Sequence, residues 1–571
     1  MLNLKEKPFF LSDEDIRWVQ ETLASMSTED RIRQLFCLIT YNDSEEYCRY
    51  IAEQVRPGGF MSRVMPLEEC ISAVGKMQKF SKIPMLVAAN FEAGGNGMIA
   101  DGTILGRPMG VAATNEVEQA RRLGEVCGAE GAAVGANWAF APIIDIDYNW
   151  RNPITNTRTF GSDPDRVRKM GRAYVEEVQK HGLAASIKHF PGDGRDERDQ
   201  HVAMSINDMS CEEWDATYGA AYRECIDAGA LTVMVGHIMM PAYSRHFRPG
   251  IPDREILPAS VSYELVTKLL REKLGFNGLV ITDSTTMAGI ATMLPRRKLV
   301  PMSIAAGNDM FLFTKNLDED IGFMMDGYNE GIISDKRLTE AVTRILALKA
   351  HLKLHIRRQE GTLVPKVEDA RKIVGQKKFL DYSRECADKS ITLVKSEEGV
   401  LPITPKKYPR VLFYSLEPKD DGLSIFGSGT GANEKFRIAL EKEGFKVDVF
   451  TPAGGFEGMM SPVSDITEKY DLILYAASLQ TKSNQTVVRI EWTNPMGINV
   501  PIYTTEVPTV FVSFENPYHL VDVPHIRTFI NCYCGFDTVV DALMEKLTGR
   551  SEFKGINPVD PFCGKWETKA F

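Results

Sequence analysis

Short apolar segments of strand length recur along the first 313 residues, and segments of helical length with one apolar face separate most of them. Eight segments predict strands, at residues 34–40, 58–61, 84–90, 138–143, 185–189, 232–237, 279–283 and 309–313. Helices are predicted between them, among others over residues 116–134, 165–180, 211–228 and 262–274. Gly182, Gly229 and Gly275 follow three of these helices, in the position of a C-cap. Eight β/α units predict a TIM-type (β/α)8 barrel.

The second half of the chain has a different order of elements. We expect a barrel domain over residues 1–355, a charged linker over 356–380 and a second domain over 381–571. Strands predicted at 411–416, 446–450, 472–477, 509–514 and 528–532 alternate with helices at 433–443 and 537–546, which is typical of an open parallel α/β sandwich. The glycine-rich run 427–432 follows no clear strand and lacks a Lys-Ser/Thr pair, so we interpret it as a loop and not as a nucleotide site.

Composition narrows the possible partners and location. The 571 residues carry 67 Lys and Arg against 77 Asp and Glu, a net charge of −10, which argues against nucleic acid and anionic membranes as partners. The chain contains no run of 18 apolar residues, and its first residues lack the apolar core of a signal peptide. We therefore expect a cytoplasmic protein whose partner is a small molecule.

Polar residues close the apolar strands of the predicted barrel. Active sites of such barrels lie at the carboxyl ends of the strands, so these residues are predicted to gather on one rim. They are Asn90 with Glu92 beyond it, Asp145, Lys188, His189, His237 and Asp283. Any one of them could simply end a strand, but their number favours a site.

A charged loop follows Lys188 and His189 and carries Asp199 and His201 two positions apart. In an extended segment residues i and i+2 face the same side, so the Asp199 carboxylate can accept a hydrogen bond from an imidazole nitrogen of His201. Asp283 ends a strand farther along the chain. A carboxylate facing a histidine acid supplies the nucleophile and the acid/base group that a retaining glycosidase requires.

These motifs resemble glycoside hydrolase family 3, in its β-N-acetylhexosaminidase branch. The resemblance rests on Lys188-His-Phe-Pro-Gly, on Asp199-Gln-His201 and on the segment that runs from Leu274-Gly-Phe-Asn-Gly to Asp283. It extends through residues 140–145, 151–164 and 258–262, and through 387–395, which is similar to the start of the second domain of that family. It therefore covers both halves of the chain.

The resemblance implies a retaining exo-β-N-acetylhexosaminidase that uses neither a metal nor an organic cofactor. Asp283 would attack the anomeric carbon, and His201, oriented by Asp199, would act first as acid and then as base. Lys188, His189 and Arg158 match positions that bind hydroxyls of the terminal sugar, and Asn90 and Glu92 lie in a sugar-binding stretch. The implied substrate is a glycoside of N-acetylglucosamine, such as a muropeptide or a chito-oligosaccharide.

Three segments depart from the pattern of the family, at four positions. Asp193 stands where a second His is usual, which alters the charge of the loop near the dyad. Asn90 stands in place of an acidic residue and Asn96 in place of an Arg, and Ser284 follows Asp283 where an acidic residue is common. The nucleophile and the dyad are retained, so these departures bear on substrate preference.

Other functions remain open on the residues alone. The acceptor could be phosphate instead of water, because a neutral histidine repels a phosphate dianion less than a carboxylate does. A β-glucosidase is a further alternative, as is a sugar-binding protein without activity. A metal-dependent barrel hydrolase would need His189, His201, His237 and Asp283 to converge on one ion, and Lys188 beside His189 disfavours it. For His237 we expect either a place in the pocket wall or a satisfied position beneath Asp283.

Overall fold

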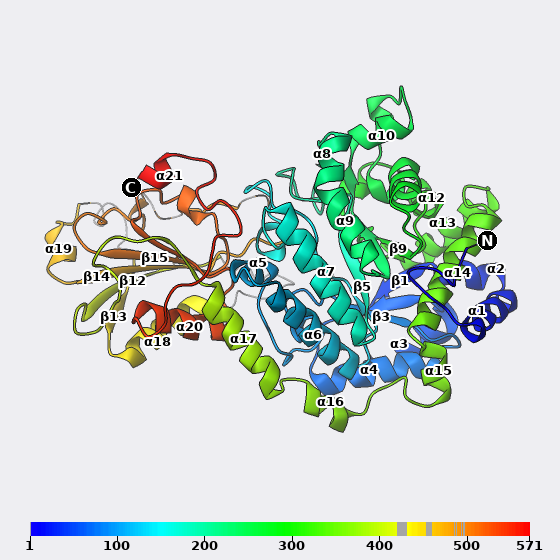
Figure 1. Cartoon of the computed structure of the whole chain (residues 1–571), viewed down its shortest axis with the longest axis horizontal. Coiled ribbons are helices and arrows are strands. Elements are labelled where there is room, and N and C mark those ends of the chain that lie inside the picture. The colour runs from blue at the N-terminus through cyan, green and yellow to red at the C-terminus, as the bar shows by residue number, and fades with distance from the viewer. Residues whose placement is uncertain are drawn as a thin grey trace. The chain divides into compact units, whose positions relative to one another are not determined.

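The computed structural model describes residues 2–40, 42–418, 431–452, 460–484, 486, 488–492, 494 and 497–570. Residues 427–430 of the predicted glycine-rich loop lie outside this range. The chain forms two compact units (Figure 1). The barrel unit comprises Met1–Ile104, Ala120–Thr155 and Pro164–Leu380, and the sandwich unit comprises Leu105–Gln119, Asn156–Asp163 and Asp381–Phe571. Two segments that lie within the barrel half of the sequence thus fold with the second unit.

The barrel unit is built on eight parallel strands in the order β10-β1-β2-β3-β4-β5-β7-β9. A bridge between Ile281 and Met310 joins the two ends of the sheet and completes the ring. The strands are β1 (Phe36–Ile39), β2 (Gly59–Met61), β3 (Leu86–Ala89), β4 (Trp138–Ala139), β5 (Ala184–Phe190), β7 (Thr232–Val235), β9 (Leu279–Thr282) and β10 (Phe311–Leu312). Each coincides with a predicted strand, and the (β/α)8 barrel is confirmed.

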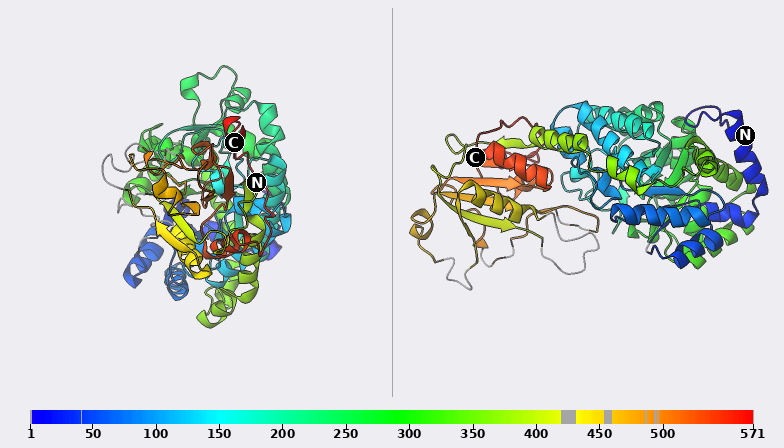
Figure 2. Two further views of the ribbon diagram at one scale, coloured as in Figure 1. Left: turned by 90° about the vertical axis from the view of Figure 1, so that its left-hand side faces the viewer. Right: turned by 90° about the horizontal axis from the view of Figure 1, so that it is seen from below.

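Helices surround these strands on the outside (Figures 1 and 2). The longer ones are α1 (Asp13–Ser25), α4 (Leu67–Phe80), α6 (Val117–Ala133), α7 (Pro164–Lys180), α9 (Tyr218–Asp227), η6 (Glu264–Lys273), α12 (Arg296–Ala305), α13 (Leu317–Asn329) and α14 (Asp335–His351). Shorter ones are α2 (Thr28–Gln34), α3 (Glu45–Arg49), η1 (Tyr50–Val55), η2 (Gly95–Gly97), α8 (Cys211–Ala216), α10 (Pro241–Phe247), η4 (Asp253–Glu255), η5 (Ala259–Val261), α11 (Ala288–Ala291), α15 (Leu354–Gln359) and α16 (Val367–Ile373). Strands β6 (Ser205–Ile206) and β8 (Ile238–Met239) form a separate parallel pair.

The helix ends follow the chemistry of their sequences. Gly182, Gly229 and Gly275 have φ values of 82°, 90° and 69°, the left-handed conformation expected of C-cap glycines. The single helix predicted over residues 211–228 is wrong in one respect, because it breaks into α8 and α9 at Thr217. The Thr217 hydroxyl donates to the carbonyl of Glu213 at 2.7 Å, a bond to the preceding turn that bends helices.

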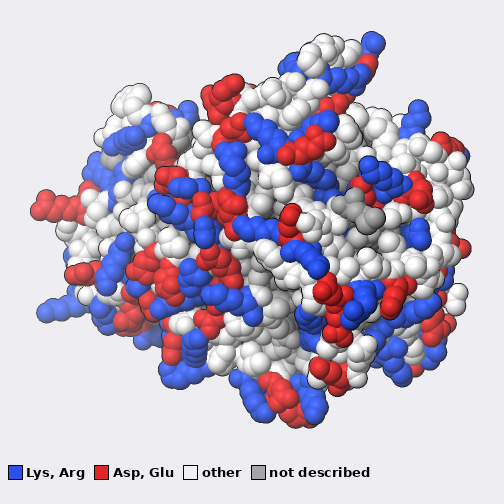
Figure 3. Space-filling view, turned by 45° about the vertical axis from the view of Figure 1, so that its right-hand side comes forward, with Lys and Arg blue, Asp and Glu red and all other residues white. Residues whose placement is uncertain are grey.

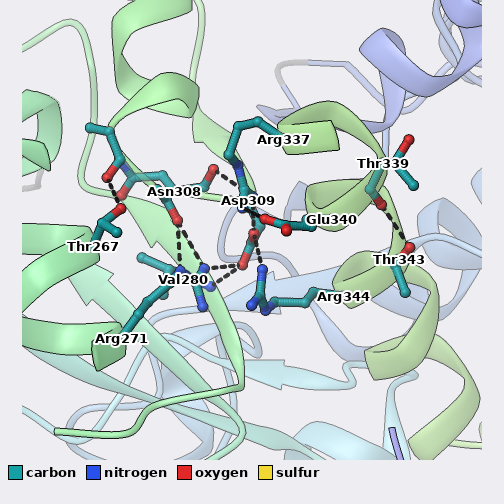
Figure 4. A network of polar contacts seen from close by, with 12 residues as sticks. Thr267, Arg271, Val280, Asn308, Asp309, Arg337, Thr339, Glu340, Thr343 and Arg344 are labelled. Carbon is teal, nitrogen blue, oxygen red and sulfur yellow. Dashed lines mark hydrogen bonds and ion pairs between the residues drawn. The ribbon is translucent and has the colours of Figure 1, made fainter. Parts of the chain in front are cut away.

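A buried ionic cluster secures the strands at the amino end of the barrel (Figure 4). Asp309, just before β10, accepts the N–H of Val280 in β9 at 3.0 Å and is fully buried. Arg271 of η6 and Arg337 and Arg344 of α14 converge on its carboxylate. The cluster therefore ties two neighbouring strands to two outer helices.

The sandwich unit has a six-stranded sheet in the order β11-β16-β15-β14-β12-β13. The strands are β11 (Thr392–Lys395), β12 (Arg410–Leu416), β13 (Lys446–Val449), β14 (Leu472–Ala477), β15 (Thr509–Ser513) and β16 (Thr528–Asn531). Five are the predicted parallel strands, whereas β11 is an antiparallel edge strand that we did not predict. Buried apolar clusters cover both faces of the sheet, as a layered α/β fold requires.

Helices of the sandwich unit include α17 (Lys377–Ser390), which begins in the barrel unit, and α18 (Ala432–Glu443) and α20 (Asp537–Leu547), which lie on one face of the sheet (Figure 1). The shorter ones are α5 (Pro108–Ala113), η3 (Asn156–Arg158), α19 (Ser464–Thr467), η9 (His519–Val521) and α21 (Glu567–Ala570). The predicted α/β sandwich is confirmed as a fold class.

Within the described residues, no helix combines the length and the apolar character that crossing a bilayer requires. On the face shown in Figure 3, basic and acidic side chains are intermingled, without a broad area of one sign. This agrees with the modest net charge of −10.

Candidate active site

Three barrel strands deliver ionisable side chains to one rim. Lys188 and His189 lie near the end of β5, Asp145 lies six residues after the end of β4, and Asp283 directly follows β9. The Asp283 N–H donates to the carbonyl of Val235 at 2.8 Å, which continues the β7–β9 ladder. Regular strand pairing therefore fixes the main chain of Asp283, which lies at the carboxyl end of the barrel.

His189 lies between two carboxylates. Its Nδ1 is 2.7 Å from Oδ2 of Asp145, and its Nε2 is 3.9 Å from Oδ2 of Asp283. Because a carboxylate only accepts, Nδ1 carries the proton that faces Asp145. Asp145 also accepts the backbone N–H of His189 at 3.0 Å, so it fixes both the ring and the main chain. Asp145 is therefore a buried brace for His189.

The second Asp–His pair is more open. His201 Nδ1 donates to Oδ1 of Asp199 at 2.7 Å, and the same oxygen accepts the backbone N–H of His201 at 2.8 Å. The Asp199 side chain is fully buried, whereas that of His201 is 25% exposed, against 5% for His189. No hydrogen bond from the described residues engages Nε2 of His201. His201 is thus the histidine that is free to exchange a proton with a ligand.

The loop that carries His201 is joined to the segment that follows Asp283. The N–H of Ala288 donates to the carbonyl of His201 at 3.0 Å, and the N–H of Gly289 donates to the carbonyl of Gln200 at 3.1 Å. The electrostatics agree with this proximity. Burial raises the pKa of Asp283, but the imidazoles of His189, His237 and His201, with the Ser284 N–H, outweigh it and hold the pKa below its usual value. Asp283 is therefore ionised at neutral pH.

Lys188 and Glu92 form a buried ion pair beside this site, with Nζ and Oε1 2.8 Å apart. Asn90, two residues before Glu92, is exposed at the end of β3, and its amide forms no hydrogen bond with the described residues. The structure thus brings together Glu92, Lys188, His189, Asp283, His201 and Asp199, with Asn90 adjacent in the chain. Arg158 ends η3 and folds with the sandwich unit, so its role in sugar binding stays a prediction.

His237 is a satisfied group beneath Asp283. Its Nε2 donates to the carbonyl of Ser284 at 2.8 Å, and its Nδ1 accepts from the hydroxyl of Ser260 at 2.8 Å. Burial lowers the pKa of His237, although Asp283 opposes this shift, so the ring is neutral near pH 7. Both nitrogens are occupied, which leaves His237 no electron pair for a metal. No group of three or more metal-binding side chains is arranged around an ion position in the described part of the chain.

The sequence did not reveal which buried residues hold the Asp199–His201 dyad in place. Asp193 is buried, and its carboxylate accepts from Asn152 Nδ2 at 2.8 Å and from Gln200 Nε2 at 3.2 Å. Burial and the neighbouring Asp145 raise the pKa of Asp193 to about 8. Asp193 is therefore largely protonated at neutral pH and does not add the negative charge that the sequence suggested. The missed signal was Gln200 itself, a polar residue between two members of a dyad.

The model described as "Glycosyl hydrolase family 3 N terminal domain" matches residues 34–348, which include all eight barrel strands. The chain belongs to glycosyl hydrolase family 3. A protein of Cellulomonas fimi named beta-N-acetylglucosaminidase/beta-glucosidase is 53% identical over 570 residues, 100% of both chains. Beta-hexosaminidase A of Pseudoalteromonas piscicida is 26% identical over 358 residues, 60% of this chain and 58% of its own length. The predicted family is confirmed, and relatives named for hexosaminidase activity are among its matches.

Two solved structures extend the comparison to the whole chain. Beta-glucoside phosphorylase BglX bound to 2FGlc has a TM-score of 0.93 and 43% identity, and the match covers 98% of this chain and 99% of that one. A family 3 beta-N-acetylglucosaminidase from Paenibacillus sp. str. FPU-7 has a TM-score of 0.77 at 21% identity, covering 94% and 99% of the chains. The latter shares the fold. These relatives and structural neighbours thus carry names of more than one activity.

Proposed function

We propose that this enzyme cleaves terminal β-linked N-acetylglucosamine and glucose residues with retention of configuration, through a covalent glycosyl ester on Asp283. The observation that carries the proposal is the pairing of an ionised Asp283 with a histidine whose Nδ1 is committed to Asp199 and whose Nε2 is free. A retaining mechanism requires this combination of a nucleophile and a separate acid/base group.

The first step forms the ester. The Asp283 carboxylate attacks the anomeric carbon, the bond to the aglycone oxygen breaks, and Nε2 of protonated His201 gives its proton to that oxygen. The buried carboxylate of Asp199 stabilises the imidazolium before the transfer and keeps the proton of neutral His201 on Nδ1 afterwards. In the second step, Nε2 takes a proton from the acceptor as the acceptor opens the ester.

The terminal sugar needs groups that bind its hydroxyls. We assign this role to Lys188, His189 and Glu92 on the barrel rim, to Asn90 next to Glu92 in the chain, and, from the family resemblance, to Arg158. Lys188 and Glu92 already neutralise each other at 2.8 Å, so they present a donor and an acceptor to a neutral sugar without a net charge. The Cellulomonas fimi relative, named for both sugars, supports two substrate classes for this chain.

A mechanism-based label tests the covalent intermediate. A 2-fluoro glucoside or a 5-fluoro N-acetylglucosaminide with a good leaving group should leave one sugar on the peptide that contains Asp283. Asp283→Asn provides the matched control, because it keeps the shape and removes the nucleophile. A label on another carboxylate, or no label in an enzyme that turns the reagent over, would refute the assignment. A panel of p-nitrophenyl glycosides then ranks glucose, N-acetylglucosamine and N-acetylgalactosamine.

Phosphate is the second candidate acceptor, and the residues near the nucleophile favour it. Asn90 and Ser284 stand where acidic residues are common, and the pKa of Asp193 is raised to about 8, so these three positions add little negative charge near Asp283. The carboxylates of Glu92 and Asp145 are paired with Lys188 and His189. His201 is neutral after the first step and repels a dianion less than a glutamate would. The beta-glucoside phosphorylase BglX, which is 43% identical over 98% of this chain, also supports phosphate as the acceptor.

The acceptor can be identified from the product. In a phosphate buffer, phosphorolysis yields the β-sugar 1-phosphate and a rate that rises with phosphate concentration, whereas hydrolysis yields the free sugar at a constant rate. Retention requires that the 1-phosphate have the same anomeric configuration as the substrate. Free sugar alone, at a rate independent of phosphate, would leave water as the acceptor.

A further inference from the structure

Gln200 separates the two members of the dyad along the chain. The three residues lie at a turn, in which the N–H groups of Val202 and Ala203 donate to the carbonyl of Asp199 at 3.0 and 2.9 Å. Gln200 is fully buried, in contrast to the 25% exposure of the His201 side chain. A buried amide is destabilising unless its donor and its acceptor find partners.

The partners of Gln200 come from three different segments. Its Oε1 accepts the backbone N–H of His237, just beyond β7, at 2.7 Å. Its Nε2 donates to the carboxyl group of Asp193, in the loop after β5, at 3.2 Å. Its backbone carbonyl accepts the N–H of Gly289, beyond Asp283, at 3.1 Å. One residue thus links the dyad to its own loop, to a barrel strand and to the segment after the nucleophile.

These contacts leave little room for the dyad to move. A Cβ on Gly289 would lie 2.4 Å from the carbonyl oxygen of Gln200, so the two segments approach as closely as only glycine allows. Asp193 is in turn fixed by Asn152 Nδ2 at 2.8 Å, and the hydroxyl of Tyr218 donates to its carbonyl at 2.7 Å. The support of Gln200 is therefore itself rigid.

We propose that Gln200 is a positioning residue for acid/base catalysis, whose buried amide fixes the Asp199–His201 dyad relative to Asp283 without touching the substrate. The inference rests on the proposed function, in which His201 protonates the leaving group. Proton transfer requires that the histidine nitrogen lie within hydrogen-bond reach of the glycosidic oxygen, and a displacement of about 1 Å can cost 10²-fold in rate. Loss of the Gln200 contacts should therefore impair protonation selectively.

Leaving-group dependence tests the inference. Gln200→Met keeps the length of the side chain and removes its donor and its acceptor. We expect kcat/KM for phenyl β-N-acetylglucosaminide, whose leaving group needs a proton, to fall roughly 10- to 100-fold. For the 2,4-dinitrophenyl glycoside, whose leaving group needs little protonation, we expect a fall of less than about threefold, because general acid catalysis contributes little there.

Gln78→Met is the matched control. Gln78 of α4 is also buried, and its amide accepts from and donates to the main chain of Met85 at 3.0 and 2.9 Å. Both variants should lose comparable stability, but only Gln200→Met should discriminate between the two glycosides. Equal losses on both glycosides in Gln200→Met, or no loss, would overturn the inference.

Two further variants keep the result interpretable. If Gln200→Met does not fold, Asp193→Asn removes only the Gln200 Nε2 bond, because its amide oxygen can still accept from Asn152, and it should show a weaker discrimination of the same sign. If Asp193→Asn shows no such discrimination between the two glycosides, the inference is overturned as well. His201→Ala measures the full contribution of the acid. If His201→Ala lowers both rates equally, the proposed role of His201 itself is wrong, whereas discrimination in His201→Ala alone rejects only the role of Gln200.

Discussion

Buried aspartates lie near the two ends of strand β9 in opposite situations. At the amino end, Asp309, which precedes β10, accepts from the N–H of Val280 and is surrounded by Arg271, Arg337 and Arg344 (Figure 4). At the carboxyl end, Oδ2 of Asp283 is 3.9 Å from Nε2 of His189, too far for a hydrogen bond. Both carboxylates are ionised, but of the two only Asp283 has an oxygen without a close partner among the described residues.

The two aspartates therefore differ in what they contribute: Asp309 contributes to the stability of the barrel, and Asp283 is available for a reaction. The arginines lower the pKa of Asp309 despite its burial, and burial with the neighbouring Arg344 lowers the pKa of Arg271 to about 9. Each charged group of the cluster is stabilised by another, so removal of one should strongly lower the free energy of unfolding. At the carboxyl-end rim, neighbouring residues position His201 and Asp283. Nε2 of His201 and Oδ2 of Asp283 nevertheless form no hydrogen bond with the described residues. Unsatisfied atoms of this kind are available to a substrate.

The largest expected effect is at the catalytic end. Asp283→Ala should lower kcat/KM by roughly 10⁴-fold or more, because the nucleophile is lost, while the free energy of unfolding stays within about 1 kcal/mol of wild type. Steady-state kinetics with thermal unfolding of the same preparation checks both. If Asp283→Ala retains turnover, the nucleophile is another residue, and the contrast between a reactive Asp283 and a structural Asp309 is wrong.

The opposite behaviour is expected at Asp309. Asp309→Asn leaves three buried guanidinium groups without their carboxylate, so the free energy of unfolding should fall by about 3–5 kcal/mol. Because the cluster lies at the end of the barrel away from Asp283, kcat per folded molecule should be unchanged at a temperature where the variant is folded. Urea unfolding combined with active-site titration separates the two quantities. A specific loss of kcat would show that the two ends are coupled.

Asp199→Ala should produce a smaller change at the catalytic end. Without its carboxylate the ring of His201 loses its orientation and its fixed tautomer, and kcat/KM for substrates with poor leaving groups should fall roughly 10²-fold. Asp253→Ala, an exposed carboxylate paired with Arg245, is a surface control that should leave kcat/KM unaltered. An Asp199→Ala enzyme with wild-type kinetics would mean that packing alone holds His201.

The smallest effect concerns the proton on Asp193. Burial and the neighbouring Asp145 raise the folded-state pKa of Asp193 to about 8, well above that of an exposed aspartate, so this group stabilises the fold fully below about pH 4 and loses that contribution as the pH rises to about 8. Asp193→Asn carries no titrating group, so its melting temperature relative to wild type should rise between pH 5 and pH 8 by at least about 2 °C. Scanning calorimetry at both pH values checks this. A difference that stays constant with pH would mean that Asp193 is ionised throughout.

Much of the site followed from local pattern. The barrel strands end where apolar alternation gives way to polar residues, so Lys188, His189 and Asp283 could be placed on the rim from the sequence. The predicted hydrogen bond between Asp199 and His201 is observed at 2.7 Å, but the extended segment from which it was predicted is wrong, because the pair forms at a turn. The antiparallel strand β11 was not predicted, because its pairing with β16 joins segments far apart in the chain. The break of the helix at Thr217 was not predicted either, because a bond from the Thr hydroxyl to the preceding turn leaves the apolar periodicity unchanged.

The sequence by itself determined which segments become strands and helices, and which chemical groups stand at the strand ends, because periodicity and strand termination are local properties of the chain. Only the tertiary structure decided which partners those groups acquire. Gln200 forms hydrogen bonds with Asp193 and His237, Arg158 folds with the sandwich unit, and three arginines surround Asp309. Such hydrogen bonds and ion pairs join residues 7 to 38 positions apart, and they depend on how strands and loops pack against one another, which no local pattern encodes.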